Sequence, residues 1–318
     1  MQHERLGDGS RLLQAVLDAP DDVAPRLIYA DWLQERADPR GEFIAVQCAL
    51  DALDTDVATE RRAYLVGRES QLLKKHRNEW LVPIFGKRAK DCELTRGFVS
   101  YVAMRAAELA GTLEGILRVE PVRRVHVTDA DVGAITASGA ASKLRALDFR
   151  GVRLGGRWVR PLCAATNLTS LEELDLVLCH LGASGAEAIA EAAGPATFPS
   201  LRSLHVANNH LRDKGAAALA RAPMLAELRF LHLGMNGIGP EGARALVASP
   251  YLANIERLVM WSNPLDVGGL GALRERFGDR LEADEASESP KDRVLVHRDR
   301  ERRLHDVARA KGRPLGER

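Results

Sequence analysis

A repeated pattern of apolar residues, beginning at residue 122, restricts the possible folds of this chain more than any other feature. Each copy has apolar residues at its positions 1, 4, 6 and 11, and the last four copies have Cys or Asn at position 9. The copies begin at Val122, Leu144, Leu171, Leu201, Leu228 and Ile255, in steps of 22, 27, 30, 27 and 27 residues. A unit of this size cannot bury its own apolar side, so the pattern predicts a solenoid of stacked units.

Each copy reads as a strand, a turn and a helix. The apolar residues at positions 4 and 6 indicate a short strand, and the Asn or Cys side chain is expected to bond backbone groups of adjacent coils. Helix-start signals and small residues follow, at 182–190, 213–220 and 239–246, and favour close packing of the helix on the strands. Over residues 120–282 the pattern resembles the ribonuclease-inhibitor type of leucine-rich repeat. The resemblance implies an α/β solenoid, with a curved parallel sheet and outer helices.

The first 80 residues have a different periodicity, which indicates helices. Apolar residues recur every three to four positions from residue 10 to residue 80. Asp22 is a candidate N-cap with Pro25 in the first turn of the helix that follows, and Asp38-Pro39 starts another helix. A fourth helix is expected from about Thr59 to Trp80. The chain therefore has a small all-α N-terminal domain before the solenoid.

Residues 26–35, RLIYADWLQE, carry the most specific motif of the helical region. Together with the flanking residues 13–22 and 38–44, they closely resemble the repeat-companion domain, and the resemblance covers residues 8–52. That domain is found in planctomycete and myxobacterial proteins, typically N-terminal to leucine-rich repeats, so it implies a bacterial protein. The family brings no assigned biochemical activity with it.

Four regions follow from these patterns. We expect a helical repeat-companion domain at 1–82, an N-terminal cap of the solenoid at 83–121, leucine-rich repeats with a C-terminal cap at 122–284, and a charged, flexible tail at 285–318. In the cap, Gly97 is expected to take the turn of a hairpin. The tail carries 10 Lys and Arg against 5 Asp and Glu over residues 291–318, with few apolar residues to bury.

The N-terminal motif offers one candidate site, made of Arg26, Tyr29, Asp31, Trp32 and Glu35. The two carboxylates lie four residues apart on one helix face, a geometry that paired acid–base groups can use. The favoured interpretation is structural: the aromatic rings pack the helices together and the charges form ion pairs. A docking surface and a carboxylate catalytic site are the alternatives.

The concave face of the repeats offers the second candidate site. The position between the two strand residues runs His126, Asp148, Asp175, His205, His232, Val259, and adjacent strands bring these residues side by side. A metal ladder there is conceivable, but no closed ligand set can be read, so no metal is expected. Trp and Arg are typical interface residues, and Met suits adaptable surfaces. The predicted partner-binding residues are Arg150, Asp175, His205, Phe230, His232, Met235, Arg257 and Trp261; an alternative role for Trp261 is covering the open end of the solenoid.

Composition and charge limit the expected class of protein and its expected location in the cell. The 45 Lys and Arg balance 44 Asp and Glu, which does not favour a nucleic-acid binder. No apolar run is long enough for a membrane span and no signal peptide is visible. The four cysteines lack metal-site spacing, so they are interpreted as reduced, mostly buried thiols. We expect a cytoplasmic protein that is monomeric in isolation and has no cofactor.

No phosphate loop, nucleophile elbow, HExxH helix or dinucleotide fingerprint occurs in the chain, so no enzyme is predicted. The first hypothesis is a protein–protein interaction scaffold or adaptor that uses the concave face of the repeats. The alternative is a regulator of a small GTPase, because ribonuclease-inhibitor-like repeats resemble those of GTPase-activating proteins for Ran. A remote alternative is a hydrolytic enzyme that uses Asp31 and Glu35.

Overall fold

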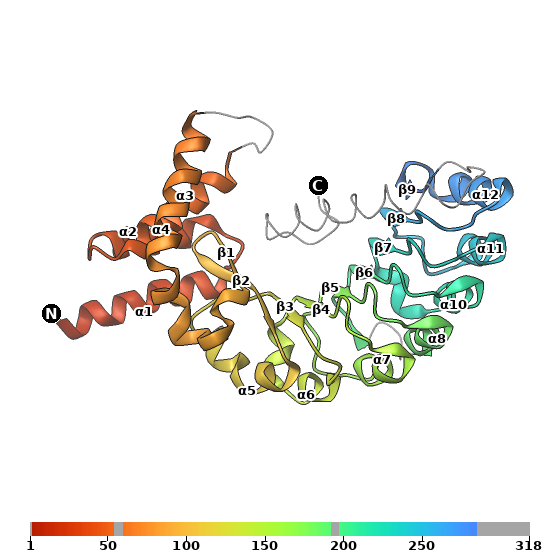
Figure 1. Ribbon diagram of the computed structural model, residues 1–318, viewed down its shortest axis with the longest axis horizontal. Helices are drawn as coiled ribbons and strands as arrows, with labels where there is room; N and C mark the ends of the chain where they lie inside the picture. The colour runs from red at the N-terminus through yellow and green to blue at the C-terminus, as the bar shows by residue number, and fades with distance from the viewer. Residues whose placement is uncertain (1, 54–59, 192–196, 285–318) are drawn as a thin grey trace. The chain divides into compact units, whose positions relative to one another are not determined.

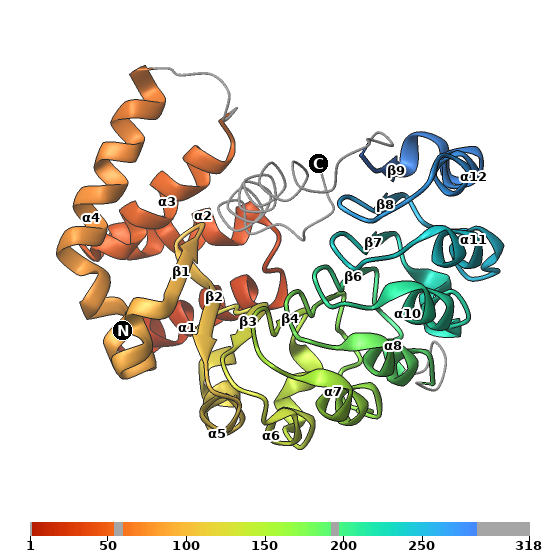
Figure 2. The same cartoon turned by 45° about the vertical axis from the view of Figure 1, so that its right-hand side comes forward.

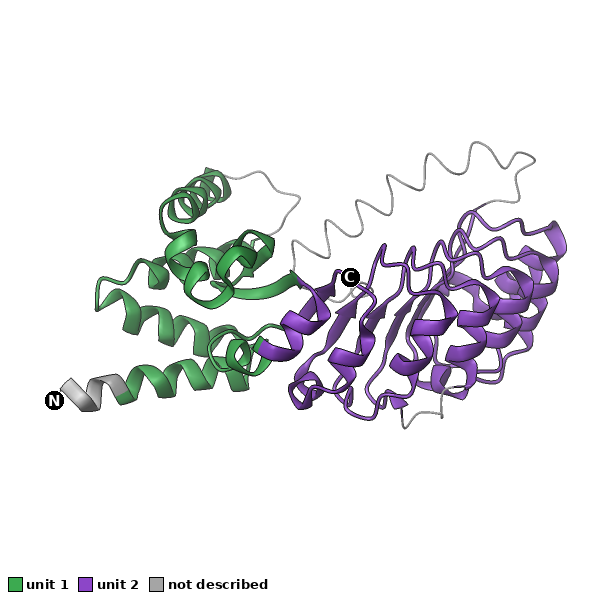
Figure 3. Ribbon diagram, turned by 60° about the horizontal axis from the view of Figure 1, so that its bottom comes forward, with its two compact units in different colours: residues 1–103, 112–123, 310–312 green, residues 104–111, 124–309, 313–318 purple. Residues whose placement is uncertain are grey.

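The computed structural model describes residues 2–53, 60–191 and 197–284, so the charged tail expected from residue 285 lies outside the described residues. The chain forms two compact units (Figure 3). Among the described residues, the first runs to Ala103 and includes Thr112–Arg123, and the second comprises Met104–Gly111 and the chain from Arg124 to Asp284. The division runs through a single helix, α5 (Ala106–Leu117). In the described residues, no helix is long and apolar enough to cross a bilayer.

Four helices make up most of the first unit, as the periodicity predicts (Figure 1). They are α1 (Gln2–Asp18), α2 (Val23–Gln34), α3 (Pro39–Asp51) and α4 (Glu60–Phe85). The helix predicted to end at Trp80 continues to Phe85 despite Pro83. Trp80, Leu81 and Phe85 are all buried, and their packing outweighs the backbone hydrogen bond that a proline removes.

The start of α3 follows from the Asp38-Pro39 pair. The Asp38 carboxylate accepts a hydrogen bond from the backbone N–H of Arg40 at 2.8 Å, and Pro39 occupies the first helical position. This start aligns Ile44 and Cys48 with the buried core of the unit. The short helix η1 (Gly86–Asp91) then leads from α4 into a hairpin.

The hairpin of β1 (Cys92–Thr95) and β2 (Phe98–Met104) is antiparallel, and the expectation that Gly97 takes its turn is confirmed. Gly97 has a φ of 85°, a conformation that side chains disfavour. A Cβ atom there would also lie 2.8 Å from the backbone Cα of Ile44 in α3. Glycine is thus required at this turn for two independent reasons.

The second unit consists of strand–helix repeats with a parallel sheet, so the predicted mixed α/β class with a helical N-terminal region is confirmed. Its strands follow one another in chain order: β3 (Arg124–Val127), β4 (Ala146–Asp148), β5 (Glu173–Asp175), β6 (Ser203–His205), β7 (Phe230–His232), β8 (Arg257–Val259) and β9 (Leu281–Glu282). The connecting helices are α6 (Val132–Thr136), η2 (Gly139–Lys143), α7 (Gly155–Cys163), α8 (Gly182–Glu191), α10 (Arg212–Leu219), η3 (Pro223–Glu227), α11 (Pro240–Ala248), α12 (Val267–Phe277) and η4 (Gly278–Arg280). Figure 2 shows α7, α8 and α10–α12 on one side of these strands. We call the opposite side of the sheet the concave face.

Small residues let neighbouring helices of this unit approach closely, as the sequence predicts. A Cβ atom on Gly215 of α10 would lie 3.3 Å from the Cβ of Ala186 in α8 and 2.8 Å from that of Leu211. A larger side chain at Gly215 would therefore push the two helices apart.

A ladder of asparagines joins the repeats through the turns that follow the strands. The Asn209 carbonyl oxygen accepts hydrogen bonds from the backbone N–H groups of Cys179 (2.9 Å) and Leu181 (3.2 Å), two residues of the preceding repeat. Its amide donates to the backbone oxygens of Leu176 and Val206, at 2.7 and 3.0 Å. Asn236 and Asn263 repeat this arrangement one and two units further along. The predicted role of the asparagines, bonding backbone groups of adjacent coils, is confirmed.

Candidate functional site

The concave face carries columns of side chains set by the strand register. Residues one before and one after the central strand residue point to this face, because side chains alternate along a strand. The register aligns Arg124, Ala146, Glu173, Ser203, Phe230 and Arg257 in one column. It aligns His126, Asp148, Asp175, His205, His232, Val259 and Glu282 in the next. The central residues between them, such as Leu174 and Leu204, are buried in the core on the other side.

Three arginines of the concave face form ion pairs with its carboxylates. Arg124 reaches Glu173 at 2.5 Å across the intervening strand, whose residue in this column is the small Ala146. Arg150 pairs with Asp175 at 3.1 Å. At the last strand, Arg257 and Glu282 pair at 2.5 Å.

The first of these ion pairs is buried, and its carboxylate stabilises the charged form of Arg124. Burial by itself lowers the pKa of the Arg124 guanidinium, but the Glu173 carboxylate outweighs it, and Asp148 and Asp175 add to the effect. The net result is a raised pKa, so Arg124 is a fixed cation on this face. Its pairing with the Glu173 carboxylate, which is 2% exposed, gives the middle of the sheet a rigid polar framework.

The carboxylates of this framework also hold the backbone. Asp148 accepts from the N–H of Arg150 at 2.8 Å, and Asp175 accepts from the N–H of Val177 at 2.9 Å. Both aspartates therefore fix the turn that follows their own strand. Their side chains therefore determine the backbone conformation of these turns as well as the charge of the concave face.

An aromatic cluster lies towards the C-terminal end of the face. The ring centroids of His205 and Phe230 are 4.7 Å apart, those of His205 and His232 are 6.1 Å apart, and those of His232 and Trp261 are 5.8 Å apart. The Arg257 guanidinium lies over the Phe230 ring, 5.3 Å from its centroid. We call His205, Phe230, His232 and Trp261 the aromatic cluster. Aromatic rings beside an arginine are residue types that anchor protein interfaces, and all four rings of this cluster are at most 8% exposed.

Most residues predicted for the concave face lie in or beside these columns. Arg150 and Trp261 each lie two residues beyond a member of the second column, Asp148 and Val259. Met235 instead lies in the turn after β7, half-buried, with its backbone N–H bonded to the Trp261 oxygen at 2.8 Å. Ser203 was not among the predicted residues, although its hydroxyl lies 2.9 Å from His205 Nε2. The repeat alignment already places Ser203 in the column beside that of His205, so the sequence contained the information needed to predict this contact.

The middle of the concave face is more buried than the sequence suggested. Phe230 and Trp261 were expected at positions that need not be buried, yet they are 8% and 6% exposed. Asp175 and His205 are 0% and 1% exposed. The alternation rule predicts which side of the sheet a residue faces, but it does not predict how much of the side chain stays exposed there.

The N-terminal motif lies in α2 and contributes to the packing of the first unit. Arg26 is buried and donates to the backbone oxygens of Arg96 (3.1 Å) and Pro20 (2.7 Å), and burial lowers the pKa of its guanidinium to about 10. Tyr29 and Trp32 stack with ring centroids 5.9 Å apart. These contacts account for the Arg, Tyr and Trp positions of the motif.

The two carboxylates of the motif, Asp31 and Glu35, are exposed on α2. Glu35 forms a surface ion pair with Arg36. Neither carboxylate belongs to the buried core against which Tyr29 and Trp32 pack.

The cysteines of the chain are all free and buried: Cys48, Cys92, Cys163 and Cys179. Burial raises the pKa of the Cys92 thiol to about 12 and that of Cys163 to about 12, and it also raises the pKa of Cys48 and Cys179. Among the residues that the structure describes, no group of three or more His, Cys, Asp or Glu side chains is arranged to hold a metal ion.

We expect all four thiols to resist labelling in the folded chain. At pH 8 a thiol with a pKa of 12 is ionised in about one molecule in 10⁴, and the thiolate is the reactive form. Ellman's reagent should therefore report almost no reaction with the native protein and four reactive thiols after denaturation. Fast labelling of any one thiol in the native chain, located by peptide mapping, would contradict this picture.

A family model described as Leucine Rich repeat matches residues 167–190, 199–220 and 227–247. These ranges coincide with the units built on β5 and α8, β6 and α10, and β7 and α11. No curated protein matches the chain. The middle of the second unit therefore consists of leucine-rich repeats, which are generally protein-interaction modules.

Proposed function

We propose that this chain is an interaction scaffold that binds a protein partner through the concave face of its repeats. The observation that carries the proposal is the aromatic cluster with Arg257 beside it, on the side of the sheet opposite the helices. Aromatic residues and arginine supply most of the binding energy in protein interfaces. The rigid parallel sheet holds these side chains at fixed spacings, so they require little ordering when a partner binds.

The ion pairs around the cluster support the same interpretation. Arg124, Arg150 and Arg257 each engage a carboxylate across neighbouring strands, which orients their guanidinium groups and sets the charge pattern of the face. Such patterns select partners and steer their approach. We propose that specificity comes from this pattern and affinity from the aromatic cluster.

The extension of the array beyond the matched repeats, and the role of the first unit as a repeat-companion domain, belong to this proposal. The solenoid would present the binding face, and the helical unit would recruit a second partner or support the first repeats. Regulation of a small GTPase and hydrolysis at Asp31 and Glu35 gain no support from the contacts of the described residues.

We expect the double substitution Phe230→Ala with Trp261→Ala to abolish partner capture. Interface anchors of this kind contribute about 2 kcal/mol or more each, so loss of both should lower affinity by roughly 10³-fold. The measurement is affinity purification with the full chain as bait, quantified by mass spectrometry, followed by a binding curve for the protein recovered.

The matched control is Trp158→Ala. Trp158 is an exposed tryptophan on α7, one of the helices on the opposite side of the sheet, so its loss should leave capture unchanged. Thermal unfolding of both variants separates lost binding from lost folding. Undiminished capture by a folded double variant would overturn the concave-face proposal.

A further inference from the structure

Helix α2 has two sides of different character, and its outer side carries apolar residues that the core does not use. The inner side lies in or against the core of the first unit through Val23, Tyr29, Ala30, Trp32 and Leu33. Ala24, Leu27 and Ile28 are exposed instead, at the helical spacing that places them on one face. Leu27 is 39% exposed and Ile28 is 56% exposed.

Folding does not explain this exposed pair. Among the described residues, Leu27 and Ile28 are the only two large apolar side chains exposed at consecutive positions. An exposed isoleucine adds no core packing, and a β-branched residue favours a helix less than lysine or glutamate does. Both residues belong to the RLIYADWLQE motif, whose arginine, tyrosine and tryptophan are accounted for by packing. Exposed apolar residues grouped on one face are typical of an interaction surface.

Two carboxylates continue the same face towards the C-terminal end of the helix. Asp31 lies three to four residues beyond the apolar pair and Glu35 lies four beyond Asp31, so both share its side of α2. Among the described residues, Asp31 has no ion-pair partner. The single cation nearby in sequence, Arg36, contacts Glu35 and holds its guanidinium over the Trp32 ring, 4.0 Å from the centroid. We call these five exposed residues the α2 face: Ala24, Leu27, Ile28, Asp31 and Glu35.

The charges of the α2 face decide between a second copy of this chain and a basic partner. In an antiparallel pair of α2 helices centred on the apolar residues, Glu35 of one copy lies opposite the helix start of the other. Asp22 stands there, exposed and without a capping hydrogen bond. In a parallel pair, Asp31 meets Asp31 and Glu35 meets Glu35. Like charges disfavour both arrangements, whereas lysine or arginine on an occupant would complement the acids.

We propose that the α2 face binds a basic amphipathic helix of a partner protein. α2 has 12 residues and is therefore about 18 Å long. A partner helix of about three to four turns matches that length, with apolar residues against Leu27 and Ile28 and basic residues near Asp31 and Glu35. This inference rests on the part of the proposed function that gives the helical unit a partner of its own. It does not depend on the concave face.

Binding of a model peptide to the full chain tests the α2 face. The probe is a fluorescein-labelled helix of about 14 residues, in which leucine recurs at helical spacing and lysine fills the other positions. A matched probe carries glutamate in place of every lysine. Fluorescence anisotropy should report binding of the lysine probe at about 0.1 M salt and weaker binding at about 1 M, where charges are screened. The glutamate probe should bind at least about tenfold more weakly.

Substitutions on the face should change both parts of this recognition. Ile28→Ala should weaken binding of the lysine probe about fivefold, because most of the apolar area that the probe covers at this position is lost. The double substitution Asp31→Lys with Glu35→Lys should weaken it at least about tenfold and strengthen binding of the glutamate probe. An exchange of preference between the two probes distinguishes lost recognition from lost folding, and circular dichroism checks the helix content of each variant.

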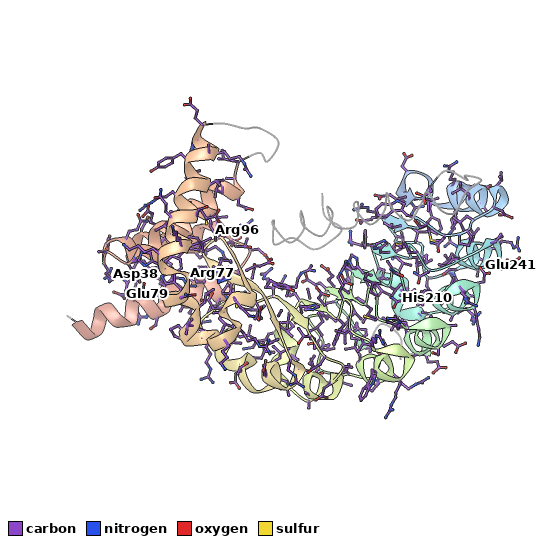
Figure 4. All side chains as sticks on the ribbon, viewed as in Figure 1. Asp38, Arg77, Glu79, Arg96, His210 and Glu241 are labelled. Atoms are coloured by element: carbon purple, nitrogen blue, oxygen red, sulfur yellow. The ribbon has the colours of Figure 1, made fainter. Side chains whose placement is uncertain are left out.

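Glu241→Lys is the matched control for the charge reversal. Glu241 is an exposed carboxylate on α11 (Figure 4) that pairs with Arg244 close by in sequence, as Glu35 pairs with Arg36. This variant should bind both probes as the unaltered chain does. The concave-face variant Phe230→Ala with Trp261→Ala should also keep its affinity for the lysine probe.

Three results would overturn the α2 face as a site for a basic helix. The first is no binding of the lysine probe to the unaltered chain, and the second is equal binding to the unaltered chain and to the α2 variants. The third is a dimer in analytical ultracentrifugation that Ile28→Ala dissociates, which would assign the face to a second copy.

The concave-face variant separates this inference from the rest of the proposed function. Probe binding that depends on Ile28 and Asp31, together with undiminished partner capture by the folded Phe230→Ala, Trp261→Ala variant, would leave the α2 face standing and refute the concave-face proposal. Probe binding that is lost in the concave-face variant and kept in the α2 variants would refute the α2 face alone.

Discussion

Replacing Asn236 with alanine is expected to lower the free energy of unfolding by about 3–5 kcal/mol, because backbone groups buried without partners cost about 1–3 kcal/mol each. The Asn236 side chain is 1% exposed. Its oxygen accepts from the backbone N–H of Asn209 at 2.9 Å, and its amide donates to the backbone oxygens of Val206 and Leu233 at 2.9 and 3.0 Å. Alanine leaves the N–H groups of Asn209 and Leu211 without this acceptor and opens a space that packing cannot close. The Val206 and Leu233 oxygens keep the amides of Asn209 and Asn263 as donors. Urea unfolding, followed by circular dichroism, measures the loss.

Asn254→Ala is the matched control for this substitution. Asn254 also donates to a backbone oxygen of a neighbouring repeat, that of Ala226 at 2.9 Å, but at an exposed position. Water replaces that bond, so we expect a loss below about 1 kcal/mol. Equal losses for Asn236→Ala and Asn254→Ala would mean that the ladder contributes no more than a surface hydrogen bond.

The second large effect is expected in the helical unit, at Glu120. Its carboxylate is 0% exposed, pairs with Arg40 at 2.5 Å and accepts from the Val99 backbone N–H at 2.8 Å. Removing one partner of a buried ion pair leaves the other charge uncompensated, at a cost of about 3–5 kcal/mol. Glu120→Ala should therefore destabilise the chain by that amount, measured by the same urea titration.

Two further variants show whether the charge or the hydrogen bonds matter. Glu120→Gln keeps an acceptor for Val99 and should recover part of the loss. Glu114→Ala removes an exposed carboxylate that pairs with Arg118, and should change stability by less than about 0.5 kcal/mol. If Glu120→Ala proved as mild as Glu114→Ala, the buried pair would not be a major contribution to the stability of this unit.

The sequence alone predicts the structural features that recur with the period of the leucine-rich pattern. Because each repeat places equivalent residues at equivalent positions, the alignment correctly predicts that His205 and His232 are neighbours on adjacent strands. It also predicts the role of Asn209 and the turn at Gly97, since both depend on local chemistry. Sequence periodicity predicts the position of a residue reliably wherever successive repeats form the same local structure.

Features that depend on distant contacts could not be predicted in this way. The pairing of Arg40 with Glu120 joins residues 80 positions apart, and nothing in either local sequence indicates it. Leu178 and Met235 adopt φ values of 60° and 57°, although neither is a residue that favours that conformation. Their N–H groups bond to backbone oxygens of the next repeat, Ala207 and Trp261, and these bonds impose the conformation.

The asparagine ladder gives the array a direction. Each asparagine bonds N–H groups of the repeat before it: Asn263 holds the turn of Asn236, and Asn236 holds the turn of Asn209. At the end of the series, Asp284 accepts from the backbone N–H of Ser262. Duplicating or deleting a whole interior unit would preserve every link, whereas losing the final unit would leave donors unsatisfied in its neighbour. Such an array can change length during evolution by internal duplication while its C-terminal end stays fixed.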